Sequence, residues 1–577
     1  MSSSAGLAQL QTIDYLIIFI YFAFVIGVGY RLKKHMVTAG DFFLAGKRIP
    51  TWACGIAFMA ANLGAIEIMG MAGMASQYGM VTAHFYWLGA IPAMVFLSLL
   101  MMPIYYGSGV RSVPEYLQKR FNEHTRAFNA ISFAVMTILM SGINLYAMAR
   151  VLNLLFSWDM NLSIFLAAII VMAYTCLGGL TSSIYNEVIQ FFLIVAGILP
   201  ITFLGLAHYG ILDFTRPPFI ITDRLTMEFS NPHMAHMWIQ MGTPTNALGV
   251  DWIGLAAGLF FVLSFGYWCT DFLVIQRAMA AKDMRASQRA PLIAAFPKIF
   301  FPLITVLPGL IAVAVFSGDK FAGVNIPNDM MLPMLMALWY PNGVLGLGLT
   351  ALMASFMSGM AANVTAFNTV WTYDIYQSYI AADRSDRHYL WMGRAATVAG
   401  IVLSVGAAYL VMNFTSIMEY MQMVFSFFNA PLFATFFLGM FWARTSPKGA
   451  FIGLVCGTTA AVLHYLFSEV VKVSPEFLPP YLAPFAPLVA ALKPYLSYRT
   501  VMAGNFWRAV FAFLACFIIT VLVSLVTKPK PKEALAGLTW STRVRYEKDE
   551  NERWFSNPYV ISMVLFVLIV LLNLSFV

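Results

Sequence analysis

Long apolar runs recur through the whole chain and constrain its fold more than any other feature. A helix needs about 20 apolar residues to cross a bilayer, and we count about fourteen such runs in the 577 residues. Unpaired backbone groups cannot face hydrocarbon, so each run must be helical. The runs are 13–31, 51–77, 82–105, 127–156, 160–178, 184–209, 249–277, 291–316, 341–372, 392–413, 416–441, 448–468, 507–527 and 556–576. We therefore predict an all-α membrane protein with about fourteen transmembrane helices.

The composition supports a membrane protein and argues against nucleic-acid binding and against a role for the cysteines in disulfides or metal binding. Hydrophobic residues make up 60% of the chain and charged residues 10%, whereas soluble domains carry about 25% charged residues. The net charge of +8 is typical of the basic loops of membrane proteins, and no basic stripe interleaved with aromatic residues indicates nucleic-acid binding. All five cysteines lie in apolar runs without a C-x-x-C pair, so we expect neither disulfides nor a thiol metal site.

Lysine and arginine residues gather in alternate loops. With fourteen crossings, six basic loops fall on one side of the membrane, and the positive-inside rule makes that side cytoplasmic. The loops carry Arg31, Lys33, Lys34, Lys47 and Arg48; Arg111, Lys119, Arg120 and Arg126; Arg277, Lys282, Arg285 and Arg289; Arg384, Arg387 and Arg394; Arg444 and Lys448; and Lys528, Lys530, Lys532, Arg543, Arg545 and Lys548. We expect a multi-pass protein of a cell membrane, with a bacterial inner membrane favoured and both termini extracytoplasmic. The Pro-rich segments 210–248 and 469–506 would be external ordered loops or short interfacial helices.

The second apolar run contains a polar interruption. Between Ala61 and Gly70 it places Asn62, Gly64 and Glu67 near the middle of the membrane. Asparagine and glycine are poor helix formers, and a break here would free carbonyl oxygens to bind a cation, as discontinuous helices do in many transporters. The alternative is close helix packing, with Asn62 hydrogen-bonded between helices. We favour the break because a carboxylate lies one turn away.

Two later runs carry similar signals. The seventh has small, polar, aromatic and acidic residues between Ser264 and Asp271, five runs after the first interruption. An inverted five-helix repeat would set these two broken helices against each other. The ninth carries Ser355, Ser358 and Gly359. Hydroxyl and carbonyl oxygens suit a hard cation, although close helix packing explains the same residues.

Four ionisable residues lie within or near the ends of apolar runs: Glu67, Glu187, Asp271 and Lys298. A charge at the bilayer centre costs roughly 2.5–3.5 kcal/mol on insertion scales. Such groups pair with each other or line a wet pathway. We favour a functional role for Glu67 and Lys298, and leave both interpretations open for Glu187 and Asp271, which lie closer to helix ends.

Short motifs spread along nearly the whole chain form an ordered set. They are Ala60-Ala61-Asn62-Leu63, Val113-Pro114-Glu115-Tyr116, Lys119-Arg120-Phe121-Asn122, Leu177-Gly178-Gly179-Leu180-Thr181-Ser182, Val188-Ile189-Gln190, Ile275-Gln276-Arg277, Val306-Leu307-Pro308-Gly309, Asp374-Ile375-Tyr376 and Gly439-Met440-Phe441-Trp442. In this order and spacing the chain resembles the sodium/solute symporter family, which includes the sodium/glucose cotransporters. The resemblance implies a LeuT-like core of two inverted five-helix repeats, with one extra N-terminal and about three extra C-terminal helices. It divides the chain into residues 1–50 (extra helix and first loop), 51–210 (first repeat), 211–248 (external loop), 249–445 (second repeat) and 446–577 (C-terminal helices).

The resemblance also implies two adjoining binding sites. Sodium would bind the carbonyls of Ala60, Leu63 and Ser355 and the hydroxyl of Ser358, with the Glu187 carboxylate nearby. Gly359 stands where the family usually has one more hydroxyl ligand, so one ligand is missing. The substrate pocket of the sugar-transporting members maps onto Glu67, Tyr86, Gly89, Ser264, Tyr267, Lys298 and Gln422. Glu67, Tyr86, Gly89 and Ser264 differ from the residue types of those members, so sugar specificity does not carry over directly.

We therefore predict a secondary active transporter, and not an enzyme. It would couple the entry of Na⁺, the coupling ion, to uptake of a small polar solute by alternating access, with a gate near Tyr267. A carboxylate, an ammonium, a phenol and an amide can hydrogen-bond a sugar or polyol, which we rank first. The nearest alternative is a proton-coupled or uncoupled carrier of an amino acid, carboxylate or organic cation; a transporter-like sensor is more remote. The expected partners are the solute and the lipid bilayer, without nucleic acid, and the sequence leaves the oligomeric state open.

Overall fold

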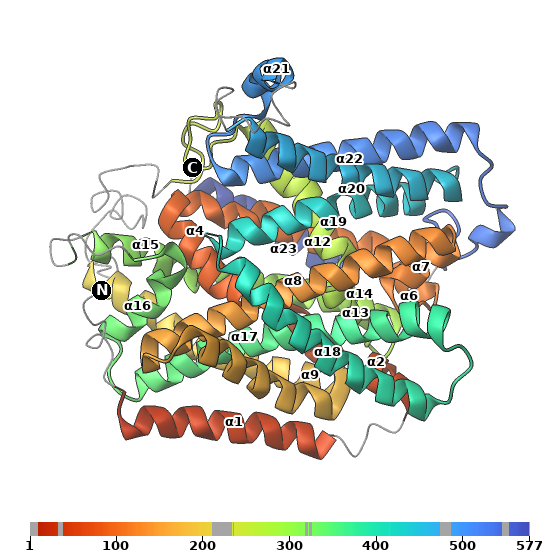
Figure 1. Cartoon of the computed structure of the whole chain (residues 1–577). Helices are drawn as coiled ribbons and strands as arrows, with labels where there is room; N and C mark the ends of the chain where they lie inside the picture. Colours follow the sequence, from red (N-terminus) through yellow and green to blue (C-terminus); the bar gives the residue numbers. More distant parts are fainter. Residues whose placement is uncertain are drawn as a thin grey trace.

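The chain folds into a bundle of long helices. The computed structural model describes residues 10–32, 38–209, 234, 236–317, 321, 326–414, 416–472, 486–544 and 553–575. Within these ranges the structure is helical, and a single β-bridge between Ile49 and Ala281 stands alone. Helix α1 (Thr12–Leu32) lies along one edge of the bundle, and α20 (Pro447–Val470) and α22 (Val501–Val526) lie towards the opposite edge (Figure 1). The all-α prediction is confirmed.

The first half of the bundle contains one long helix pair and several short segments. In chain order its further elements are α2 (Ala39–Leu44), η2 (Ala45–Lys47), α3 (Thr51–Ala60), η3 (Ile66–Gly70), α4 (Met71–Tyr78), η4 (Gly79–Ala83), η5 (Phe85–Ala90), α5 (Ile91–Phe96), η6 (Leu97–Met101), α6 (Met102–Gly107), α7 (Val113–Arg120), α8 (Glu123–Phe156) and α9 (Met160–His208).

The second half repeats this mixture of long and interrupted helices. Its elements are α11 (Trp252–Gly254), η8 (Leu255–Ser264), α12 (Phe265–Thr270), α13 (Phe272–Met279), α14 (Met284–Ile299), η9 (Phe301–Leu303), α15 (Val306–Phe316), η11 (Asn328–Met330), α16 (Met331–Trp339), α17 (Val344–Thr369), η12 (Val370–Ile380), α18 (Asp386–Val411), α19 (Ile417–Phe441), α20, α21 (Ala486–Leu496), α22, η15 (Glu533–Leu535), η16 (Trp554–Ser556) and α23 (Pro558–Ser575).

The structure has twelve helices, among the residues it describes, that are long and apolar enough to cross a membrane. The two predicted runs that fall outside this count, 51–77 and 160–178, contain shorter apolar helices, Thr51–Ala60 and Met160–Ala173. Each is shortened by a break in the backbone. Run 51–77 stops being helical after α3, and run 160–178 ends at a kink inside α9. The count of fourteen therefore differs from the twelve long helices because the sequence does not mark where an apolar run bends.

Gly179 makes the kink in α9 possible. Its backbone has φ 55° and ψ −154°, a combination that residues with a side chain rarely adopt. A Cβ added there would lie 2.6 Å from the carbonyl oxygen of Phe42 on α2. Glycine therefore allows α9 to turn while α2 packs directly against it.

Polar residues at the helix boundaries act as N-caps. Ser112 accepts a hydrogen bond from the backbone N–H of Glu115, Asn122 from that of Thr125, and Asp283 from that of Ala286. Such caps satisfy backbone groups that the first turn of a helix leaves free. These boundaries are therefore built into the local sequence.

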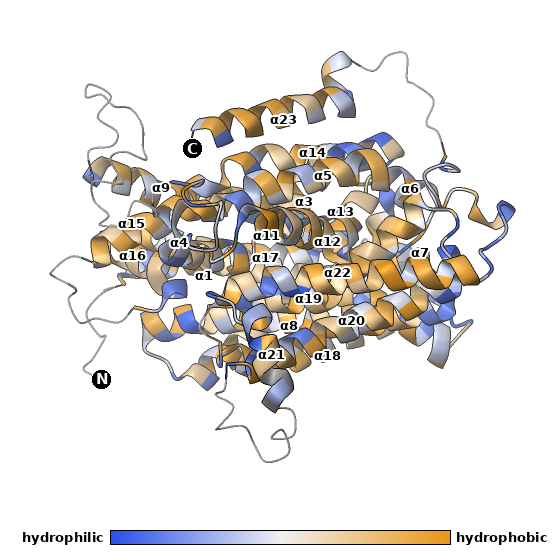
Figure 2. Ribbon diagram, turned by 90° about the horizontal axis from the view of Figure 1, so that it is seen from above, coloured by the Kyte–Doolittle hydropathy of each residue, from blue (hydrophilic) through white to orange (hydrophobic). Residues whose placement is uncertain are grey.

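The outer surface of the bundle is apolar, as lipid contact requires. Along the helices most residues are hydrophobic, and hydrophilic residues gather towards the helix ends (Figure 2). The peripheral helix α1 exposes large apolar side chains such as Leu16 and Phe19, and α23 exposes Met563 and Phe566. By contrast, α17 is buried along nearly its whole length. The centre of the bundle therefore lies around α17.

Three arginines that we assigned to basic loops are in fact buried: Arg120, Arg126 and Arg277. Arg120, on α7, donates to the backbone carbonyls of Gly439, Trp442 and Thr445. Arg277, on α13, is 0% exposed and pairs with another buried side chain. The charges of Arg120 and Arg277 are thus satisfied inside the protein, because each guanidinium finds several oxygen acceptors there. The orientation of the termini stays a prediction.

The longer loops are described only in part. Residues 210–233 and 473–485 lie outside the described residues, and the predictions that fall on them stay untested. Within the second Pro-rich segment, Ala486–Leu496 forms the short helix α21, in line with the expectation of short helices there. Figures 1 and 2 place the start of α1 and the end of α23 towards the same end of the bundle.

Candidate functional site

The interruption predicted in the second apolar run is present. Helix α3 ends at Ala60, residues 61–64 form a turn, and a π-helical segment, η3, begins at Ile66. The side chain of Asn144 on α8 accepts a hydrogen bond of 2.9 Å from the N–H of Ala65, which supports the chain where it re-enters the helix. The break therefore exposes backbone groups at the buried centre of the bundle.

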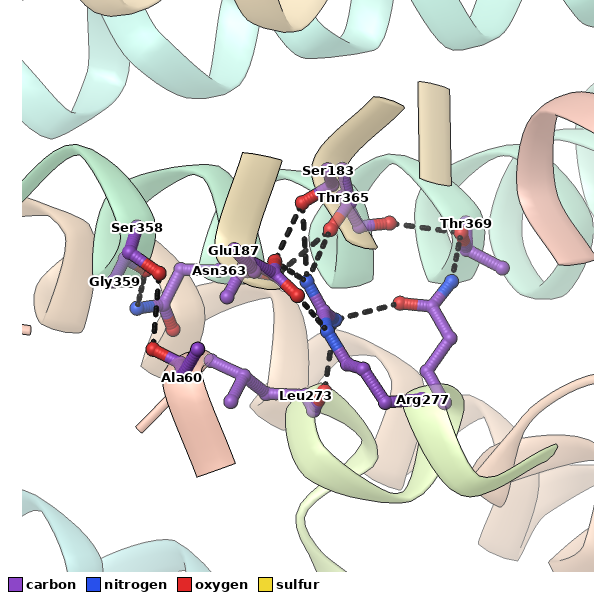
Figure 3. Close-up of polar contacts among 12 residues, drawn as sticks. Ala60, Ser183, Glu187, Leu273, Arg277, Ser358, Gly359, Asn363, Thr365 and Thr369 are labelled. Carbon is purple, nitrogen blue, oxygen red and sulfur yellow. Dashed lines mark hydrogen bonds and ion pairs between the residues drawn. The ribbon is translucent and has the colours of Figure 1, made fainter. Parts of the chain in front are cut away.

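Helix α17 packs directly against this break. The Ser358 hydroxyl donates a 2.9 Å hydrogen bond to the Ala60 carbonyl (Figure 3), and that carbonyl also accepts from the N–H of Leu63. The Ser355 hydroxyl is buried and has no hydrogen-bond partner among the described residues. Two of the predicted sodium ligands, Ala60 at the end of α3 and Ser358 on α17, are thus in direct contact, and their oxygen atoms are of the kind that a hard cation prefers.

Gly359 stands where the two helices come closest. A Cβ added to it would lie 2.7 Å from the Cα of Gly64 and 2.7 Å from the amide oxygen of Asn144. Contacts this short are not tolerated, so a side chain at position 359 would push the break away from α17. The hydroxyl side chain that the resemblance leads us to expect at position 359 would therefore not fit between these two closely packed glycines.

A cavity opens beside the break. Its empty volume, including the space open to solvent, is about 490 Å³. Six of the seven residues that the resemblance assigns to the substrate pocket line it, and Gly89 does not. The lining residues are Asn62, Ile66, Glu67, Met71, Phe85, Tyr86, Ala90, Leu263, Ser264, Tyr267, Trp268, Lys298, Met418, Met421, Gln422 and Phe425. These residues come from the break, η3, α4, η5, η8, α12, α14 and α19.

Glu67 and Lys298 form an ion pair in the wall of the cavity. The Lys298 ammonium donates to the Glu67 carboxylate and, over 2.5 Å, to the amide oxygen of Asn62. Lys298 is 1% exposed and Glu67 is 6% exposed. Burying a charge is tolerated only when it is paired and hydrogen-bonded, and this arrangement meets that condition for both side chains.

Aromatic side chains shape the rest of the cavity. The Tyr267 ring stacks on Phe425 with centroids 5.0 Å apart, and its hydroxyl accepts a 3.1 Å hydrogen bond from the Asn62 amide. The Tyr86 hydroxyl pairs with that of Thr305 at 2.9 Å. Gln422 presents an amide oxygen with no partner among the described residues. The cavity thus combines apolar walls with a few fixed polar groups, as small-molecule sites do.

Gly89 does not line this cavity. A Cβ added to Gly89 would lie 2.4 Å from the hydroxyl oxygen of Ser264. The Ser264 side chain therefore fills the space where a side chain at position 89 would begin. The two differences from the sugar-transporting members, at 89 and at 264, fit each other in space.

Glu187 belongs to a second buried network, close to the Ala60–Ser358 contact (Figure 3). Its carboxylate accepts hydrogen bonds from Arg277 at 2.6 Å and from Ser183 at 2.6 Å. Arg277 also donates to the Leu273 carbonyl at 2.8 Å and to the Thr365 hydroxyl at 3.2 Å. The network joins α9, α13 and α17, and it leaves the Glu187 charge neutralised by an arginine rather than free to face a cation.

Asp271 marks the break in the seventh apolar run. Its backbone is extended, with φ −75° and ψ 116°, and its side chain caps α13 by accepting from the N–H of Leu273 at 2.9 Å. The interruption therefore lies at the end of the predicted stretch Ser264–Asp271. Ser264 itself ends a π-helical segment, and such segments are frequent at functional sites.

Comparison with known proteins decides the family. A model of the sodium:solute symporter family matches residues 42–457. The chain belongs to this family. The symporter is 27% identical over 560 residues to sodium/glucose cotransporter 4 of Mus musculus, covering 92% of this chain and 78% of the relative. It is 28% identical over 485 residues to the sodium/glucose cotransporter of Vibrio parahaemolyticus (81% and 87%) and 26% identical over 586 residues to the human sodium/myo-inositol cotransporter (96% and 78%).

A solved structure supports the fold. The symporter superimposes on a Na⁺-coupled sialic acid symporter, solved in a substrate-bound outward-open state, with a TM-score of 0.73. The identity is 19%, and the match covers 90% of this chain and 99% of the other. The LeuT-like fold class is confirmed, and the protein is a sodium-coupled solute symporter with Na⁺ as its coupling ion.

Sequence reasoning missed some residues of the symporter's cavity. Trp268 and Phe425 line it, and Phe301 lies against the Lys298 ammonium, but none was predicted, because aromatic residues are common throughout this chain. Arg277 was assigned to a loop although it pairs with Glu187. The sequence did contain a signal for that pair, because Glu187 and Arg277 are opposite charges in consecutive apolar runs, and charged side chains within a membrane usually pair with one another.

Proposed function

We propose that this symporter uses the sodium gradient to take up a small uncharged polyhydroxylated solute, a sugar or polyol. The solute binds in the cavity beside Glu67, Tyr86, Ser264, Tyr267, Lys298 and Gln422. Sodium binds between the carbonyls of Ala60 and Leu63 on one side and the Ser355 carbonyl and Ser358 hydroxyl on the other.

One observation carries this proposal. The cavity and the proposed sodium site share the same break in the chain: the Ala60 carbonyl before the break contacts Ser358, and Asn62 and Glu67 line the cavity. An ion that fixes the break therefore also fixes one wall of the solute site. The named specificities of the relatives, for glucose and for myo-inositol, support a polyhydroxylated solute.

The mechanism is alternating access. Sodium joins the break to α17 and favours the state that accepts solute from outside. Tyr267, stacked on Phe425, then moves aside to release the solute inwards. One charge moving down the membrane potential supplies about 2.3 kcal/mol per 100 mV, and this energy reaches the solute only if sodium binds the solute-competent state better than the other state.

The expected topology completes the proposal. Both termini lie on the extracytoplasmic side of a cell membrane, a bacterial inner membrane being favoured. The apolar exterior of the bundle and the alternation of basic loops support this arrangement. The five-part division of the chain, with inverted repeats at 51–210 and 249–445, belongs to the same proposal.

The test is uptake of labelled D-glucose and myo-inositol into liposomes that contain the purified protein. We expect accumulation with an inward sodium gradient and little uptake when choline replaces sodium outside. Labelled amino acids and carboxylates serve as the competing solute classes. Accumulation of one of those classes, with neither polyol transported, would contradict the proposed substrate.

A further inference from the structure

The cavity carries two opposite charges and is neutral as a whole. Glu67 and Lys298 are the only carboxylate and the only ammonium among the described residues that line it. They are in direct contact, and both are buried. The charge that a solute would meet is therefore set by this single pair.

Lys298 is held from several sides. Besides Glu67 it donates to Asn62. Its ammonium also lies 5.0 Å from the ring centroid of Tyr86, 5.1 Å from that of Trp268 and 5.2 Å from that of Phe301. Aromatic rings at such distances attract a cation. The ammonium is thus fixed by contacts inside the protein and is not free to turn towards a charge on a solute.

Breaking the pair would leave one charge buried without its partner, which is strongly unfavourable. An anionic solute would compete with Glu67 for the ammonium while facing the Glu67 carboxylate. A cationic solute would face the ammonium in turn. Hydroxyl groups avoid both conflicts, because they can donate to the unpartnered oxygen of Gln422 and approach the intact pair without displacing either member.

We propose that the Glu67–Lys298 pair is a charge filter that restricts transport to uncharged polyhydroxylated solutes and rejects their acidic and amino derivatives. This inference rests on the proposed function and names the residues that exclude charged solutes from its site. The filter acts through the neutrality of the pair, so removing one charge changes which solute is preferred rather than only how tightly it binds.

Three variants separate these effects. Glu67→Gln leaves the ammonium without its carboxylate, so the cavity gains a preference for an anion. Lys298→Met leaves the carboxylate alone, so it gains a preference for a cation. The double variant Glu67→Gln/Lys298→Met is neutral again and returns to uncharged solutes. Ser264→Ala is the matched control, because it removes a polar lining group without changing the charge.

The experiment measures binding of D-glucose, myo-inositol, D-glucuronate and protonated D-glucosamine to each purified protein in sodium-containing buffer. Within each protein we compare the ratios of dissociation constants, since a ratio is unaffected by a loss of properly folded material. We expect the wild type, the double variant and Ser264→Ala to favour D-glucose. We expect Glu67→Gln to shift the ratio towards D-glucuronate, and Lys298→Met towards D-glucosamine, each by about tenfold or more.

One outcome would contradict the charge filter alone, and a different outcome would contradict the proposed function as well. If the wild type binds D-glucose and the single variants keep its order of preference, the charge filter is overturned while the proposed function stands. If the wild type binds neither D-glucose nor myo-inositol, the proposed function is overturned and the filter with it.

Discussion

Ser358 contacts the residue just before the break in the chain, and Glu67 lies just after the break. The Ser358 hydroxyl donates to the Ala60 carbonyl, while Glu67 pairs with Lys298 in the wall of the cavity. At the scale of single residues, Ser358 and Glu67 could be singled out from the sequence, because a polar residue stands out in an apolar run. The sequence could not predict Trp268 or Phe301 in the same way, since an aromatic residue in an apolar run has many possible neighbours.

Removing the Ser358 hydroxyl tests the sodium ligands. We expect Ser358→Ala to raise the sodium concentration for half-maximal solute uptake by about tenfold, roughly the 1.4 kcal/mol of one lost ligand contact. Ser404→Ala is the control, because Ser404 is equally buried and bonds only the Gly400 carbonyl of its own helix. An unchanged sodium dependence in Ser358→Ala would mean that the cation binds elsewhere.

Asp329 provides a test of pH dependence outside the membrane-spanning helices. The pKa of its carboxyl is raised to about 7, with burial as the largest cause; the N–H of Ile417 and the Arg150 charge lower this pKa, and the Glu419 charge raises it, and the value of about 7 includes all of these effects. A raised pKa means that the folded state favours the protonated form, so stability falls as the pH rises through about 7.

We expect Asp329→Asn to remove this contribution. The melting temperature of the variant should rise relative to wild type between about pH 5 and pH 8, because in that range folding of the wild type requires its carboxylate to take up a proton or, above about pH 7, to be buried with its charge. If the difference in melting temperature between wild type and Asp329→Asn is the same at about pH 5 and about pH 8, Asp329 does not titrate in this range.

At the scale of elements, interruptions in helices build the site. The break after α3 was predictable from Asn62 and Gly64, which disfavour a helix. The break in the seventh run lies at Asp271, at the end of the predicted stretch, because its side chain caps the following helix. The π-helical segments η3, η5 and η8 had no signal in the sequence, since one extra residue per turn depends on packing between neighbouring helices.

The contact between the break and α17 predicts the effect of restoring a hydroxyl at position 359. The added Cβ would lie 2.7 Å from Gly64. We therefore expect Gly359→Ser to weaken sodium binding and lower the melting temperature. Gly359→Ala is the control, because it adds a Cβ without a hydroxyl, and we expect the same two effects from it. Tighter sodium binding in Gly359→Ser than in wild type would contradict this close packing.

The Glu187–Arg277 pair predicts coupling between α9 and α13. Removing one partner of a buried pair costs about 3–5 kcal/mol, so Glu187→Gln and Arg277→Met should each lower the melting temperature strongly. The melting temperature of the double variant should fall by much less than the summed decreases of the two single variants, because neither charge is left buried without its partner. Additive losses would mean that the two side chains act independently.

At the scale of the whole molecule, the order of apolar runs and short motifs was enough to predict the LeuT-like fold. The number of long helices was less accessible, because an apolar run does not reveal a bend such as the one at Gly179. The burial of Arg120 and Arg277 was missed for a related reason. The sequence near the end of an apolar run does not show whether a charged side chain faces water or buried oxygen acceptors.

In the proposed mechanism, sodium and solute bind at two faces of the same break, so each must affect the binding of the other. Linkage requires the effect to be reciprocal. Calorimetric titration of D-glucose or myo-inositol into the purified protein at increasing sodium concentration tests this directly. We expect the solute dissociation constant to fall as the sodium concentration rises, and Ser358→Ala to shift this dependence to higher sodium concentrations. A solute dissociation constant that stays the same from sodium-free to saturating conditions would contradict the proposed mechanism.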